Sequence, residues 1–136
     1  MKYLLDTNIC IYIINEKPEK VLRKFERHAV TEFGISSITH AELQYGVAKS
    51  KNKKTNQDAL DEFLVPLTIL PFQGIKLVKC YGEIRASLES KGKTIGPLDM
   101  LIAAQALSLD LTIISNNIKE FSRIPKLRCE NWTQGK

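Results

Sequence analysis

The chain has 136 residues, of which 43% are hydrophobic and 26% charged, as is ordinary for one soluble globular domain. No apolar run approaches the roughly 20 residues of a membrane span, and no signal-peptide pattern occurs, so we expect a cytoplasmic protein without membrane contact. The three cysteines lack a C-x-x-C pair, which argues against disulfides and structural zinc, and the formal net charge of +5 suits a polyanionic partner.

The first half of the chain alternates short strand patterns with helical patterns. We expect strands at residues 3–5 and 33–36, and helices at residues 8–14, 18–28, 39–49 and 55–64. Basic residues gather at Lys17, Lys20, Arg23, Lys24 and Arg27, and again at Lys49, Lys51, Lys53 and Lys54. These clusters are either solvated helix faces or a surface that binds a polyanion.

The second half continues the same alternation. A brief strand at 68–70 precedes a helix at 75–89, and after a break at 92–96 an almost wholly apolar helix runs over 97–109. A buried strand is expected at 112–114 and a last short one at 128–130. Strands that alternate with helices predict a single α/β domain over residues 1–136, with three α/β/α layers around a mainly parallel sheet.

Polar side chains follow several predicted strands, at the sheet edge where ligands bind in such folds. Asp6 follows the first strand and interrupts the apolar run "LLDTNICIYII". Glu42 and Asp99 are each expected in the first turn of a helix, and Ser115, Asn116 and Asn117 follow the strand "LTII". Because the carboxyl ends of parallel strands share one edge, these groups are candidates for a common site.

Each of these residues also has a purely structural explanation. Asp6 could form an Asx turn or cap the next helix. Thr39 and Glu42 have the spacing of a capping box, and Asp99 could simply favour a helix N-terminus electrostatically. The asparagine pair, taken alone, indicates only a turn.

Taken together, the three acids point to a metal site. Two carboxylates about 4 Å apart repel by roughly 4 kcal/mol at an effective dielectric of 20, so a gathered set needs a cation. Mg²⁺ prefers oxygen ligands and typically binds one or two carboxylates while keeping several waters. Such an ion polarises a phosphoryl oxygen and activates a water, which is the chemistry of phosphodiester hydrolysis.

Other chemistries find less in the sequence. With only His28 and His40 present, a histidine-rich zinc site or a two-histidine nuclease has little support, and no G-x-S-x-G motif occurs. The segment Gly92 to Thr94 reads "GKT" but follows a helix, and Ser87 occupies the position of the required glycine, so it is not a phosphate-binding loop.

The sequence resembles a known family, the PIN-domain ribonucleases, and specifically the VapC-type toxins of bacterial toxin–antitoxin pairs. Four motifs in order carry the resemblance: "LLDTNI", "SSITHAELQYG", "IRASLESKGKTIGPLDMLIAAQAL" and "ISNNIKEFSRIPKLRCENW". They cover nearly the whole chain. The resemblance implies a Mg²⁺- or Mn²⁺-dependent endoribonuclease with an α/β/α fold and an acidic pocket at the edge of a parallel sheet.

The resemblance also assigns roles to particular residues. Asp6 and Asp99 match the metal-binding aspartates, and Glu42 matches a further catalytic acid. Asn117 lies where many relatives carry a fourth acid, and its neutrality favours one ion over two. Supporting contacts are implied for Thr7, Asn8 and Ser115, which match hydrogen-bonding positions, and for Arg85, which is either a substrate contact or an ordinary surface arginine.

The resemblance further implies a VapB-type antitoxin as partner, a structured RNA such as a tRNA as substrate, and a homodimer. Two alternatives stay open. In a phosphotransferase with Asp6 as nucleophile we would expect an acid two residues later, where this chain has Asn8. A non-catalytic basic RNA-binding module would bind RNA without needing a metal ion and without cleaving it.

Overall fold

A computed structural model describes residues 1–133, so the predicted domain over 1–136 extends three residues beyond the described part of the chain. All five strands are parallel and form one sheet with the order β3-β2-β1-β4-β5. The strands are β1 (Tyr3–Leu5), β2 (Phe33–Ser36), β3 (Thr68–Leu70), β4 (Thr112–Ile114) and β5 (Cys129–Glu130). The N-terminal strand therefore lies in the middle of the sheet.

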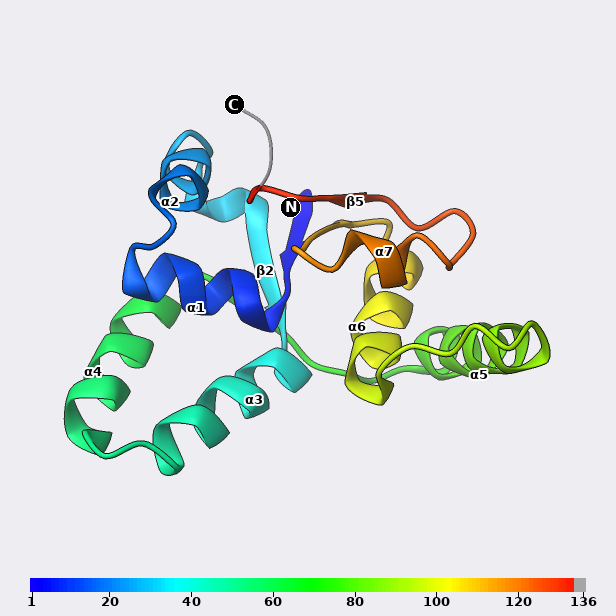
Figure 1. Cartoon of the computed structure of the whole chain (residues 1–136), viewed down its shortest axis with the longest axis horizontal. Coiled ribbons are helices and arrows are strands. Elements are labelled where there is room, and N and C mark those ends of the chain that lie inside the picture. The colour runs from blue at the N-terminus through cyan, green and yellow to red at the C-terminus, as the bar shows by residue number, and fades with distance from the viewer. Residues whose placement is uncertain (134–136) are drawn as a thin grey trace.

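Helices cover both faces of this sheet, which confirms the predicted three-layer α/β/α architecture (Figure 1). On one side lie α1 (Thr7–Asn15), α2 (Glu19–Glu26), α3 (Ser37–Ala48) and α4 (Lys53–Leu64). On the other side lie α5 (Ile75–Ser90), α6 (Pro97–Ser108) and the short α7 (Ile118–Phe121). Within residues 1–133, no helix is long and apolar enough to cross a membrane.

The hydrophobic core is divided into two clusters by the sheet. Leu5, Ile35 and Ile114 point into the cluster beneath α1 to α4, whereas Leu4 and Ile113 point into the cluster beneath α5 to α7. Adjacent strand residues thus face opposite layers, as the period of two requires. Because both faces are covered, the central strands are apolar throughout, which explains the uninterrupted hydrophobic runs in the sequence.

Helix boundaries differ from the sequence-based expectation in informative places. The expected start of α3 at Thr39 is wrong by two residues, because Ser36 is the N-cap and its Oγ accepts a hydrogen bond from the Ile38 N–H at 3.0 Å. The helix expected over residues 18–28 is shorter, since Pro18 is the N-cap of α2 and the helix ends at Glu26. The sequence patterns did not predict α7 or the single 3₁₀ turn at Val30–Glu32.

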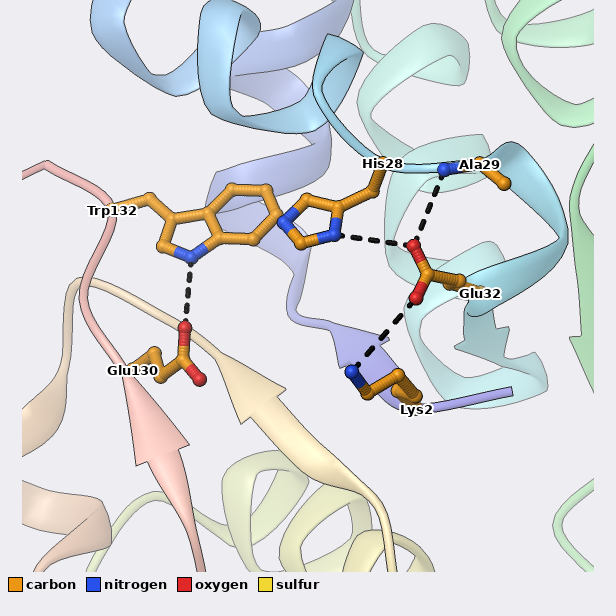
Figure 2. Close-up of polar contacts among 6 residues, drawn as sticks. All are labelled: Lys2, His28, Ala29, Glu32, Glu130 and Trp132. Atoms are coloured by element: carbon orange, nitrogen blue, oxygen red, sulfur yellow. Dashed lines mark hydrogen bonds and ion pairs between the residues drawn. The ribbon is translucent and has the colours of Figure 1, made fainter.

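The segment after β5 packs against the loop between α2 and β2. Figure 2 shows the Trp132 indole beside the His28 imidazole, with ring planes 5° apart and centroids separated by 5.6 Å. The indole Nε1 donates to Glu130 Oε1 at 3.2 Å, and His28 Nδ1 lies 3.1 Å from Glu32 Oε2. Trp132 is buried, so this contact ties the end of the sheet to the loop that precedes β2.

Candidate active site

Asp6 lies directly after β1 and caps helix α1. Its Oδ1 accepts a hydrogen bond from the Ile9 N–H at 3.0 Å, and its own N–H donates to the Ile114 carbonyl of β4 at 3.1 Å. The capping role that the sequence allowed is therefore real. Yet the residue is only 5% exposed, and capping does not require burial, because exposed aspartates also cap helices. A buried carboxylate at this edge thus needs a further explanation.

The environment of Asp6 opposes its negative charge. The pKa of Asp6 is raised from 3.8 to about 6, chiefly by burial and in smaller part by the nearby charges of Asp99 and Glu42, against hydrogen bonds from the Ser115 hydroxyl and the Ile9 N–H that lower it. Asp6, Glu42 and Asp99 are far apart in the sequence, yet the charges of Glu42 and Asp99 act on the Asp6 carboxylate. Ser115 is itself fully buried, and its Oγ also accepts a hydrogen bond from the Asn117 N–H at 2.8 Å.

Glu42 lies in the second turn of α3 and not in its first turn as expected. The proposed capping box with Thr39 is wrong, because the N-cap is Ser36, so Glu42 is not engaged in capping. Instead the Thr7 hydroxyl donates to Glu42 Oε1 at 2.7 Å. This bond links the first residue of α1 to α3 across 35 residues of sequence, and it orients the Glu42 carboxylate beside the end of β1.

Asp99 is the third residue of α6 and approaches the site from the other layer. Its Oδ2 accepts a hydrogen bond from the Asn117 side-chain amide at 3.4 Å. Burial raises the pKa of Asp99, the charges of Glu120 and Glu42 add to the increase, and the Asn117 amide opposes it. Asp99 therefore shares with Asp6 the repulsion of Glu42, and it has Glu120 as an additional acidic neighbour.

Glu120 is a residue of this cluster that sequence analysis missed. The Asn117 amide donates to Glu120 Oε2 as well as to Asp99, so one neutral side chain joins two carboxylates. A fourth acid is thus present beside Asn117, although Asn117 itself is neutral. Asn117 followed by Glu three residues later has the spacing that marks a helix start, and this signal would have located α7 and its acid.

Two other predicted supporting residues lie at the surface. Asn8 is exposed, and the N–H that reaches Asp6 is that of Ile9, one residue later. Arg85 is exposed on α5, where it donates to the Tyr81 hydroxyl at 3.1 Å and to Glu89 Oε2 at 3.1 Å. Both of these partners belong to its own helix, so the contacts of Arg85 are those of a surface ion pair.

Comparisons with known proteins identify the family of this chain. The PIN domain family matches residues 3–127. Ribonuclease VapC2 of Rickettsia felis is 51% identical over 133 residues, which span 97% of this chain and 98% of that protein. The chain belongs to the VapC family of PIN-domain ribonucleases. The parallel sheet with helices on both faces is consistent with the fold of this family.

One further VapC relative carries a more specific name, and a solved structure matches nearly the whole chain. The tRNA(fMet)-specific endonuclease VapC of Salmonella typhimurium is 39% identical over 132 residues, covering 97% of this chain and 98% of that protein. The solved structure of VapBC2 from Rickettsia felis, bound to a DNA fragment from its promoter, superposes with a TM-score of 0.89 and 51% identity. That match covers 97% of this chain and 99% of the solved VapC chain.

The acid cluster of this VapC chain fits a hard cation with oxygen ligands. Among the groups of residues 1–133 that shift the pKa values of Asp6 and Asp99, every charged one is another carboxylate. In the same part of the chain, no three Asp, Glu, His or Cys side chains converge closely enough to hold one ion together. Carboxylate oxygens are the ligands that hard divalent cations prefer, so the donor atoms of Asp6 and Asp99 fit such an ion.

Proposed function

We propose that this VapC-family ribonuclease is a Mg²⁺- or Mn²⁺-dependent endonuclease that cuts structured RNA, with a tRNA as substrate. Its substrate class is inferred from relatives named as tRNA(fMet)-specific endonucleases, of which one is 39% identical over nearly the whole chain. Its role as the toxin of a pair with a VapB-type antitoxin is inferred from the VapBC complexes of its structural relatives.

The observation that carries the metal dependence is the burial of Asp6 beside two other acids. A carboxylate that is 5% exposed, with a pKa raised to about 6, is still mostly ionised at pH 7 and is repelled by Asp99 and Glu42. A bound cation would turn this unfavourable arrangement into a favourable one. A helix cap needs only one such side chain, so capping alone does not explain three acids at one edge of the sheet.

The residues of the chain divide the work among them. Asp6 and Asp99 would hold the ion, which when bound supplies a polarised phosphoryl oxygen and a more acidic water. Ser115 and the Ile9 N–H keep the Asp6 carboxylate in one orientation, and Thr7 does the same for Glu42. The Asn117 side-chain amide donates to both Asp99 and Glu120 and so holds the two carboxylates near each other.

The test is incubation of the purified protein with bulk tRNA, with Mg²⁺ or with EDTA. We expect cleavage with Mg²⁺ and none with EDTA, and Asp99→Asn should abolish cleavage while leaving the fold intact. The matched control is Asp110→Asn, which removes an exposed acid just before β4, at the opposite end of that strand from the acid cluster, and should cut at the wild-type rate. RNA binding that ignores EDTA, without cleavage, would instead identify a non-catalytic binding module. A covalent aspartyl phosphate would identify a phosphotransferase.

The antitoxin is proposed to inhibit through charge. The antitoxin would place an Arg or Lys against Asp6, Glu42 and Asp99, in competition with the metal, and an arginine there could make bidentate contacts to the carboxylates. Raising the Mg²⁺ concentration should therefore weaken the complex, and Glu42→Gln should weaken it too. A complex that ignores both changes would show that the antitoxin blocks RNA access elsewhere. The toxin itself is proposed to be a homodimer, which light scattering of the isolated protein measures.

A further inference from the structure

An exposed aromatic residue lies next to the acid cluster on α3. Tyr45 is 65% exposed and follows Glu42 by three residues, a spacing that makes the two side chains neighbours on a helix surface. One turn further, the Lys49 ammonium lies 5.0 Å from the centre of the Tyr45 ring. A carboxylate, an aromatic ring and a cation thus follow one another along one side of this helix.

Tyr45 is not needed to build the core. The buried residues of α3 are Thr39, Leu43 and Val47, and the last two supply its hydrophobic contacts with the core. Tyr45 points away from them, and its hydrophobic ring remains largely in solvent. A large exposed aromatic ring is a common mark of a binding surface, because it offers area and a flat face at little conformational cost.

We propose that Tyr45 stacks on a base of the RNA substrate next to the cleaved bond and that Lys49 binds a neighbouring phosphate. This inference rests on the proposed ribonuclease function. Proteins recognise RNA largely by stacking splayed bases on aromatic side chains, with cations along the backbone. The spacing fits, since Glu42 and Lys49 are separated by about 10 Å along the helix, or roughly three stacked nucleotides at about 3.4 Å each.

The charge of the surrounding surface favours RNA over a protein partner. Beyond Lys49 the chain continues through Lys51, Lys53 and Lys54 into the start of α4. A groove of about 430 Å³ between α3 and α4 has Lys53 and Lys54 in its lining. The acids would hold the metal at one end of α3, and the lysines would attract the phosphates at the other end. A polyanion that crosses the helix meets Tyr45 between them.

Substitutions at Tyr45 separate stacking from simple hydrophobic contact. The test compares the Kd of each variant for fluorescein-labelled tRNA, measured by anisotropy in EDTA. It also compares KM and kcat for tRNA cleavage in Mg²⁺. Tyr45→Leu and Tyr45→Ala should weaken binding by roughly 5- to 150-fold and raise KM, whereas Tyr45→Phe should stay within about twofold of wild type. Val65→Ala, which trims a side chain that is 83% exposed at the end of α4, is the control and should change nothing.

A fluorescent variant reports the stacking directly. The single native tryptophan, Trp132, is 3% exposed, so Tyr45→Trp adds one solvent-exposed indole over a constant background. Adding tRNA should quench the emission of that indole, and Tyr45→Trp should keep wild-type affinity. Lys49→Ala should weaken binding and reduce the slope of log Kd against log salt by about 1.

Two results would overturn the inference. If the wild type cleaves tRNA while Tyr45→Leu has the same Kd and KM, the base does not stack on this ring. If Tyr45→Leu instead changes the oligomeric state or the affinity for the antitoxin at unchanged Kd for tRNA, the ring belongs to a protein interface. Failure of the wild type to bind or cut any RNA would overturn the proposed function as well, and so differs from the first two results.

Discussion

Replacing Asp6 by Asn should stabilise the metal-free protein at neutral pH while it abolishes RNA cleavage. The folded-state pKa of about 6 lies above the ordinary value of 3.8, so the folded protein binds the Asp6 proton more tightly than the unfolded chain does. Stability from this group is complete below pH 3.8, falls as the pH rises towards 6, and is lost above it. At roughly 1.4 kcal/mol per pH unit, the ionised carboxylate costs about 3 kcal/mol above pH 6.

Asparagine avoids this cost because it does not ionise, and it caps helices as well as aspartate does. Chemical denaturation in EDTA should therefore give Asp6→Asn a higher free energy of unfolding at pH 7.5, by up to about 3 kcal/mol, with a smaller gain at pH 4.5. Asp58→Asn, at an exposed position, should show no such dependence on pH. Adding Mg²⁺ should stabilise the wild type but not Asp6→Asn, because ligand binding stabilises only a folded state that binds it.

Two outcomes would refute this reasoning. A free energy of unfolding of Asp6→Asn at pH 7.5 at or below the wild-type value would mean that Asp6 carries no buried charge penalty. A gain that is equal at pH 4.5 and pH 7.5 would mean that the stabilisation comes from packing and not from the removal of an ionisable group.

Three further substitutions test the other members of the cluster. Glu120→Gln should lower cleavage by roughly 10- to 100-fold, as for groups that support a metal site, and unchanged kcat/KM would remove Glu120 from it. Asn117→Asp should tighten Mg²⁺ binding in titration calorimetry and lower the melting temperature in EDTA, whereas the neighbouring Asn116→Asp should do neither. Arg85→Ala should raise KM for tRNA at unchanged melting temperature, and an unaltered KM would leave Arg85 as a surface residue of α5.

The central strands were predictable because strands buried on both faces consist of consecutive apolar residues. Tyr3, Leu4 and Leu5 are all buried, since β1 lies in the middle of the sheet with helices on both faces. An apolar run of this kind, stopped by a carboxylate, indicates a strand end at a site. The position of Asp6 at the end of β1 could therefore be inferred from its neighbours in the sequence, and so could its second role as the N-cap of the next helix.

Other parts of the site depend on contacts that sequence spacing does not record. The Thr7–Glu42 hydrogen bond joins residues on two different helices, and no local pattern fixes it. Helix α7 has four residues, too few to show a helical period, so the only sequence signal for Glu120 was its spacing from Asn117. The start of α3 was displaced because two consecutive serines and a threonine can all serve as N-caps, and only the folded chain shows that Ser36 does so.

The central place of β1 determines when the acid cluster can form during synthesis. The first strand leaves the ribosome early, but its partner β4 consists of residues 112–114. Until those residues emerge, Asp6 lacks the Ile114 carbonyl and the Ser115 hydroxyl that fix it, and Glu120 has not yet been made. The acid cluster therefore forms only after residues 114–120 have been synthesised and have joined the sheet, and a nascent chain that stops short of β4 lacks it.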